Sequence, residues 1–231
     1  MSHHSKPQKS ACKRAQLAIE KLEVWPSGPG IPLHTQFYPR DKIVTFLNRE
    51  EVEKVLLCKC DSCKQHLSYL SQEGSNQSPR QYLDKIIPLR DAAERAVSLF
   101  ALMILLQYPL LIIPLLSRGY QDKTHVDNYP KDTHNTRDRE VGRLKEYFGC
   151  LGPDEAESLA KRFWETVFKF AVPTLSGKDF TIYHANTVLP FLTSERLGEG
   201  SFGDVFAFTI YADYNKLPVS FNTPRAPVYS P

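Results

Sequence analysis

The sequence has little of what would place the chain in a secreted, membrane or nucleic-acid-binding class. The first 30 residues contain no apolar run of signal-peptide length and carry Pro26 and Pro29, which is untypical of a secretory leader. The five cysteines are an odd number, and without a leader they favour free thiols in a reducing compartment. The net charge is only +3 at pH 7, with no basic stripe of the kind that binds nucleic acid. We therefore expect an intracellular protein, cytoplasmic rather than nuclear, with no nucleic-acid partner.

Composition and period predict a mainly α protein. The 231 residues are 42% hydrophobic and 24% charged, as in ordinary globular proteins, and they suffice for one domain or for one domain plus a fragment of another. We expect four parts: a weakly ordered lead over residues 1–36, a helical domain over 37–173, a short β-rich segment over 174–212, and a disordered, proline-rich tail over 213–231. A short helix is expected within the lead, from Ala11 to Val24.

The helical domain is predicted from apolar residues that recur at intervals of three and four. Asn48 is placed to cap one helix. Pro153 and the acids after it are typical of the first turn of another, which we expect to end at Pro173. The second helix carries an apolar stripe whose members should be buried: Leu159, Ala160, Phe163, Trp164, Val167, Phe168 and Ala171. Two ion pairs at i,i+4 are expected on its exposed side: Glu157 with Lys161, and Glu165 with Lys169.

The segment from Ala96 to Leu116 is the most apolar part of the chain. It is long enough to cross a hydrocarbon core of about 30 Å, so a membrane-anchored protein is the alternative that this segment raises. Gln107 and Pro109 fall near its middle and Pro114 follows, which divides the run into two shorter pieces. We expect two short helices buried in the helical domain rather than a membrane span.

A glycine-rich stretch is the strongest functional motif. Three glycines followed by Val205 have the spacing G-x-G-x-x-G-x-V. A Rossmann-type use of such glycines needs a helix after them, whereas residues 205–210 favour a strand. In a strand–turn–strand hairpin, the glycine backbone can approach phosphates and donate amide hydrogens to them. A hairpin with incidental glycines is the alternative. The candidate nucleotide-binding residues are Leu197, Gly198, Glu199, Gly200, Ser201, Phe202, Gly203 and Val205, with Leu197 and Val205 against adenine and Phe202 at the tip.

Segments before this loop extend the pattern. A helix with Phe163 and Trp164, then His184, then the Leu-Pro-Phe segment at 189–191 precede the glycines. Over residues 160–212 the chain resembles the N-terminal region of a fungal protein-kinase-like protein. The resemblance implies a helical domain followed by the first strands of a kinase N-lobe, with ATP as ligand. It also implies protein kinase activity, of the serine/threonine type, and magnesium binding in a full-length relative.

The rest of the kinase machinery is missing from the sequence. Lys216 stands just before Pro218 and not on a hydrophobic strand, and the H-R-D-x-x-x-x-N and D-F-G segments do not occur. The Asp179–Phe180 pair precedes the loop and lacks the glycine. We therefore expect a truncated kinase-like chain with no catalytic residue, no phosphate transfer, and weak or vestigial ATP binding. A non-enzymatic helical module that binds partner proteins is the alternative.

Cysteines and a histidine cluster at the spacing C-x-C-x-x-C-x-x-H: Cys58, Cys60, Cys63 and His66. Thiolates and imidazole at such spacing can hold Zn²⁺ tetrahedrally, but structural sites usually draw their ligands from two separated pairs. Free thiols on a turn and a helix end are the favoured interpretation, with a zinc site and a redox switch as the alternatives. The sequence thus predicts no tightly held metal.

Overall fold

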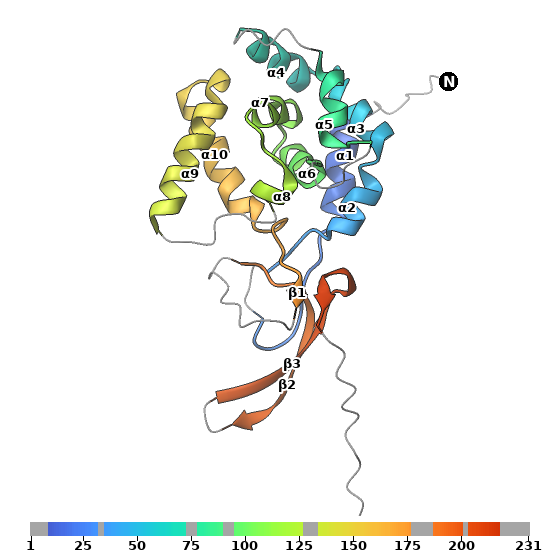
Figure 1. Cartoon of the computed structure of the whole chain (residues 1–231), viewed down its shortest axis with the longest axis vertical. Coiled ribbons are helices and arrows are strands. Elements are labelled where there is room, and N and C mark those ends of the chain that lie inside the picture. Colours follow the sequence, from blue (N-terminus) through green and yellow to red (C-terminus); the bar gives the residue numbers. More distant parts are fainter. Residues whose placement is uncertain are drawn as a thin grey trace, which may run out of the picture.

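The computed structural model describes residues 9–31, 35–72, 78–89, 95–126, 134–176, 187–200 and 203–217. The fold is mainly α, as the sequence predicts, with the helices gathered in one body and a β-hairpin projecting from it (Figure 1). The helices are α1 (Ala11–Glu20), α2 (Arg40–Phe46), α3 (Arg49–Leu56), α4 (Asp61–Gln72), α5 (Leu83–Ile86), α6 (Val97–Leu105), α7 (Ile112–Ser117), α8 (Asp122–His125), α9 (His134–Tyr147) and α10 (Pro153–Val167). The strands are β1 (Leu175–Ser176), β2 (Phe191–Gly200), β3 (Gly203–Ile210) and β4 (Asn215–Lys216).

The hydrophobic core is built around α6. Residues 97–104 of this helix are all buried, and α1, α2 and α10 pack against it. The expected break after α6 is confirmed: Gln107 adopts a φ of 71°, and a 3-10 turn at Pro109–Leu111 leads into the equally buried α7. Within the described ranges, no helix combines the length and the apolar character needed to cross a membrane.

Both ends of α6 are satisfied by side chains from distant elements. At its N-terminus, the carboxylate of Asp122 accepts hydrogen bonds from the backbone N–H groups of Ser98 and Leu99, each at 2.9 Å. At its C-terminus, Arg162 of α10 donates to the carbonyl of Leu106 at 3.1 Å. These bonds pair groups that a buried helix end would otherwise leave unsatisfied. They fix the central helix in place between α8 and α10.

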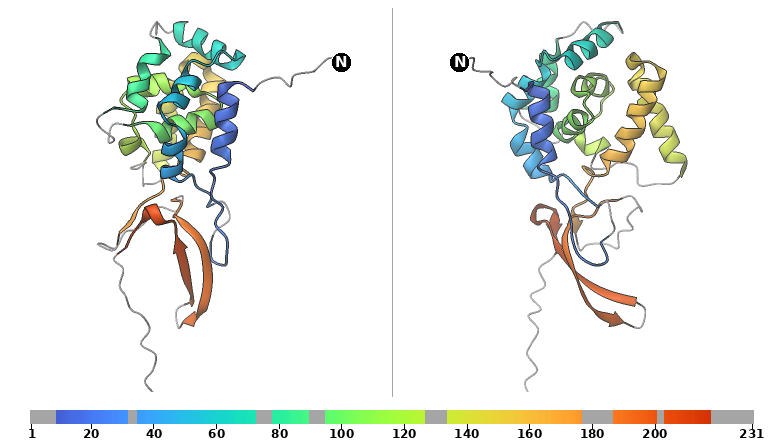
Figure 2. Two further views of the ribbon diagram at one scale, coloured as in Figure 1. Left: turned by 90° about the vertical axis from the view of Figure 1, so that its right-hand side faces the viewer. Right: turned by 180° about the vertical axis from the view of Figure 1, so that it is seen from behind.

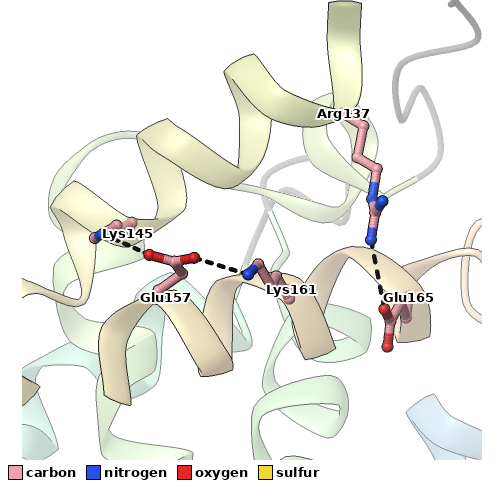
Figure 3. Close-up of polar contacts among 5 residues, drawn as sticks. All are labelled: Arg137, Lys145, Glu157, Lys161 and Glu165. Carbon is pink, nitrogen blue, oxygen red and sulfur yellow. Dashed lines mark hydrogen bonds and ion pairs between the residues drawn. The ribbon is translucent and has the colours of Figure 1, made fainter. Parts of the chain in front are cut away.

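Helix α10 begins at Pro153 as expected, and the buried part of its stripe runs from Leu159 to Val167. It ends at Val167, six residues before the proline that was expected to end it, because residues 168–170 already form a turn. The pair of Glu157 with Lys161 is confirmed at 2.7 Å, and Lys145 of α9 also contacts Glu157 at 2.7 Å (Figure 3).

The expected pair of Glu165 with Lys169 was wrong. Lys169 lies beyond the last turn of α10, where the i,i+4 geometry no longer holds. Its ammonium instead contacts Glu23 at 2.7 Å, and Glu165 contacts Arg137 of α9 at 3.6 Å (Figure 3). These two ion pairs therefore link separate segments of the chain.

The segment expected to be a weakly ordered lead contributes to the core. Ala15 and Ile19 of α1 are buried against α6 and α3. After α1 the chain descends beside the hairpin (Figure 1), where Val24 pairs with Phe37 and Ser27 pairs with Thr193 of β2. The difference arises because the surface that covers α1 comes from other helices, so the sequence of α1 alone does not indicate how it packs.

The β segment is a hairpin joined to the helices by a small second core. That core comprises Phe37, Val172, Val188 and Tyr214. The tail expected to be disordered from residue 213 starts as ordered structure, since Tyr214 is buried and β4 pairs in parallel with β1. Residues 218–231, the β-prone residues 180–183 and His184 lie outside the described residues. Of residues 188–191, which are also β-prone in sequence, only Phe191 belongs to β2.

Candidate functional site

The glycine motif lies at the closed end of an antiparallel hairpin. Gly198 pairs with Val205, and Gly200 pairs with Gly203 across the turn between β2 and β3. The ladder has two register shifts, one of them between Arg196 and Gly198. The arrangement is strand–turn–strand, which is the geometry that the kinase use of these glycines requires and the Rossmann use does not. The tip residues Ser201 and Phe202 lie outside the described residues.

The two side chains expected to contact adenine are uncovered. Leu197 is 65% exposed and Val205 is 50% exposed. Large apolar side chains of a hairpin normally pack against a neighbouring element, and these two have none among the described residues. Both views in Figure 2 show the hairpin extending away from the helices, so the helical body does not supply this cover.

Two of the described glycines, Gly198 and Gly28, differ in what the fold requires at their positions. A side-chain carbon added at Gly198 would meet no atom within 4 Å, so nothing in the fold requires glycine there. At Gly28, by contrast, φ is +119° and an added carbon would overlap the backbone of Ser194 in β2. Gly28 is a packing glycine that lets the segment after α1 lie against the hairpin, whereas Gly198 leaves open space above the strand.

The base of the hairpin is held to the helical body by tyrosines. The Tyr214 hydroxyl accepts a hydrogen bond from the backbone N–H of Arg40 at 2.9 Å, and the Tyr211 hydroxyl donates to Asp41 at 3.1 Å. Both rings also make edge contacts with Phe37, at centroid distances of 6.2 Å and 5.9 Å. The start of α2 is therefore the anchor of the hairpin base, while the glycine end stays free.

A cleft of about 520 Å³ opens at this junction. Its walls include Arg40, Asp41 and Arg95 from the helical body, and Asp213 and Tyr214 from the segment after β3. None of the six candidate nucleotide-binding residues that the structure describes lines it. The cleft and the glycine turn are thus separate features of the β segment.

A second candidate site is a cluster of four thiols. The sulfur atoms of Cys12, Cys58, Cys60 and Cys63 all lie within 4.8 Å of one another. The sulfur atoms of Cys12 and Cys63 are 3.2 Å apart. Three of these residues were candidates from the sequence, and the fourth comes from a helix 46 residues earlier.

Three elements bring the thiols together. Cys12 lies in the first turn of α1, Cys58 and Cys60 lie in the connection between α3 and α4, and Cys63 lies in the first turn of α4. Cys58 and Cys63 are buried, and the other two are partly buried. The packing of α1 against α3 sets this arrangement. No local sequence signal marks Cys12 as a partner, because only the tertiary contact places it there.

His66, the fourth candidate ligand from the sequence, is not part of the cluster. Its side chain is buried, and the ring stacks on Tyr108 at a centroid distance of 4.9 Å. Burial lowers the pKa of His66, an effect that the charge of Glu155 opposes. The ring packs on Tyr108 and not against the thiols, so the expected Cys₃His set is replaced by four cysteines.

The thiols influence one another's ionisation. A hydrogen bond from the Cys12 thiol lowers the pKa of Cys63 to about 7. The same contact, together with burial, raises the pKa of Cys12. Cys150, the fifth cysteine, lies after α9 and outside the cluster.

Comparison with known proteins gives no relative: the chain matches no protein-family model, no curated protein and no solved structure.

Proposed function

We propose that the chain is the helical, regulatory part of a protein-kinase-like protein and that it carries the phosphate-binding hairpin of an ATP site. The observation that supports this most directly is the hairpin itself, with Gly198, Gly200 and Gly203 at its turn. A glycine turn between two strands can lay backbone amides over phosphates. The helical body supports the base of this hairpin and leaves Gly198 and Gly203 exposed.

The exposure of the hairpin supports a ligand or further strands as its natural cover. Leu197 and Val205 are the residues that would form the apolar roof over adenine, and both are largely exposed. Exposed apolar side chains beside a glycine turn are expected where only one half of a nucleotide pocket is present and no ligand is bound. In a complete kinase lobe, the next strand and the second lobe would provide the other half.

Binding of ATP to this chain is expected to be weak. A ligand held by one hairpin keeps much of its surface in water, whereas functional pockets bury about 70–90% of a ligand. The phosphate-gripping lysine and the magnesium ligands are also missing from the sequence. Each tenfold loss of affinity corresponds to about 1.4 kcal/mol, so losing these contacts moves the dissociation constant to the millimolar range.

Nuclear magnetic resonance titration of the isotopically labelled chain with ATP and magnesium tests the proposal at this affinity. We expect graded shifts of the amide signals of residues 197–205 and no saturation at micromolar ATP. Unshifted hairpin amides at millimolar ATP would contradict the proposal and favour the non-enzymatic helical module. A dissociation constant near a micromolar would mean that the chain forms a complete pocket.

Two matched glycine variants separate ligand contact from effects on the fold. An added carbon at Gly198 or at Gly142 of α9 would meet no atom within 4 Å. Gly198→Ala should keep the spectrum of the free protein and weaken the ATP-induced shifts, because the methyl group occupies the space over the strand. Gly142→Ala should leave the shifts unchanged. Equal responses of the two variants would exclude a role for the glycine turn.

A further inference from the structure

We propose that Cys12, Cys58, Cys60 and Cys63 form a structural zinc site that ties α1 to the connection between α3 and α4. The proposal is independent of nucleotide binding, since the cluster lies in the helical body and shares no residue with the hairpin. Its basis is the meeting of four sulfur atoms, contributed by two distant segments, within a sphere of metal-site dimensions.

The distances suit tetrahedral zinc. A zinc–sulfur bond of about 2.3 Å places the sulfurs of a tetrahedral Cys₄ site about 3.8 Å apart. The four sulfurs here lie within 4.8 Å of one another, and those of Cys12 and Cys63 are 3.2 Å apart. Small adjustments of the side chains bring all four to equal separation around one ion. A set of only free thiols has no reason to gather four side chains from two segments at one point.

The number of ligands makes the site structural. Four thiolates complete the coordination shell of zinc and leave no open position for water or substrate, as catalytic sites require. One pair of ligands is separated by a single residue in the connection after α3, and Cys12 closes the site from α1. The ion would thus add a second link between elements that already pack through Ala15 and Ile19.

The surroundings compensate the charge of the complex. Zinc with four thiolates carries a charge of −2, and the thiols release their protons when the metal binds. Cys12 and Cys63 lie in the first turns of α1 and α4, whose N-termini carry partial positive charge. A lysine adjoins each part of the cluster in the sequence: Lys13, Lys59 and Lys64. The one acidic residue between the ligands, Asp61, has a fully exposed side chain.

The site also has an entrance. A cleft of about 630 Å³ is lined by Cys58 and Cys60 together with the basic residues Arg14, Lys54 and Lys59 and the acidic residues Glu50 and Glu53. The cluster is therefore half-open on one side, which lets an ion enter the folded or nearly folded protein. Cys63, which is buried, does not line this cleft.

Metal content of the full chain, purified with a reducing agent and without chelator, is the first measurement. We expect one zinc ion per chain. Replacement of zinc by Co²⁺ should give the strong visible absorption of a tetrahedral thiolate complex. Absence of stoichiometric metal after refolding with zinc, or a disulfide between Cys12 and Cys63 in the protein as isolated, would overturn the proposal.

Single substitutions distinguish this site from the local Cys₃His knuckle. Cys12→Ser should lose the metal or bind it far more weakly, although Cys12 is distant in sequence from the motif. His66→Phe should retain one zinc ion, because its ring stacks on Tyr108 and not in the cluster. Cys150→Ser, a control outside the cluster, should also retain it. Retention by Cys12→Ser and loss by His66→Phe would refute the Cys₄ assignment.

Hydrogen exchange shows whether the ion has the structural role. Removal of zinc by a chelator should increase exchange in α1, around Ala15 and Ile19, while α6 and α10 keep their protection. If Cys12→Ser does not fold, the chelated wild-type chain supplies this measurement. Equal protection of α1 with and without metal would exclude the proposed link.

Discussion

The buried carboxylate of Asp122 gives the sharpest test of how the helical core is held. Its side chain is fully buried and accepts two backbone hydrogen bonds from the first turn of α6. The guanidinium of Arg40 is 4.0 Å away. Asp122→Ala removes these contacts and leaves two buried N–H groups without an acceptor. We therefore expect this substitution to destabilise the N-terminus of α6, although Asp122 is 23 positions away in sequence from Leu99.

The size of the effect follows from the contacts. A hydrogen bond to a charged group contributes about 1.5–3 kcal/mol, and Asp122 accepts two such bonds at the start of α6. We expect Asp122→Ala to lower the free energy of unfolding by about 3–5 kcal/mol, out of a total of about 5–15 kcal/mol for a typical domain. Asp122→Asn keeps one acceptor oxygen and should have an intermediate effect.

Urea unfolding, followed by circular dichroism and by the fluorescence of the buried Trp164, measures this loss. The control is Asp154→Ala, which removes an exposed acid from the first turn of α10 and should cost only about 0.3–1 kcal/mol. A change of less than about 0.5 kcal/mol for Asp122→Ala, the range of ordinary surface substitutions, would refute the reasoning.

Three further outcomes are expected. Radiolabelled ATP with magnesium and a generic substrate should give only background transfer, because the catalytic segments are missing; turnover abolished by Gly200→Val would contradict this. Gly28→Ala should destabilise the docking of the hairpin more than Gly119→Ala, since both glycines have positive φ but only at Gly28 would the added carbon overlap Ser194; equal losses in urea unfolding would disprove the role of that contact. Burial lowers the pKa of His66. As pH falls, the histidine of the unfolded chain therefore takes up a proton before that of the folded chain does. The stability that the neutral buried ring contributes is lost as pH falls below the pKa of the unfolded chain, about 6.5. The stability of His66→Phe should therefore fall less between about pH 7.5 and about pH 5 than that of the wild type, and identical pH profiles would argue against a buried neutral ring.

Local sequence patterns correctly predicted those features that depend on residues within a few positions of one another. The Asn48 cap is confirmed, since its side chain accepts a hydrogen bond from the N–H of Glu51 at 3.0 Å. The break at Gln107 and the start of α10 at Pro153 are likewise present. In each case the signal comes from neighbouring residues, either a capping side chain or a proline. The hairpin at the glycine turn belongs to the same group, because turn glycines and β-prone flanks are adjacent in sequence.

Contacts between distant segments were the part that local patterns missed. Lys169 pairs with Glu23 and not with its helical neighbour, and α6 is capped by Asp122 although no capping side chain stands at its own start. Neither contact has a periodic or spacing signal, since each depends on how the helices pack.

The cysteine cluster shows most clearly which features the sequence determined and which only the tertiary structure determined. The short spacing of Cys58, Cys60 and Cys63 is enough to place three thiols in one turn and the following helix end, and sequence alone identified them. It could not tell His66 from Cys12 as the fourth member. A tertiary contact stacks His66 on Tyr108, and the packing of α1 on α3 carries Cys12 into the cluster. Cys12 meets the other three thiols only when the core that joins α1 to α3 has formed. For that physical reason, the tertiary structure and not the sequence determined the fourth member of the cluster.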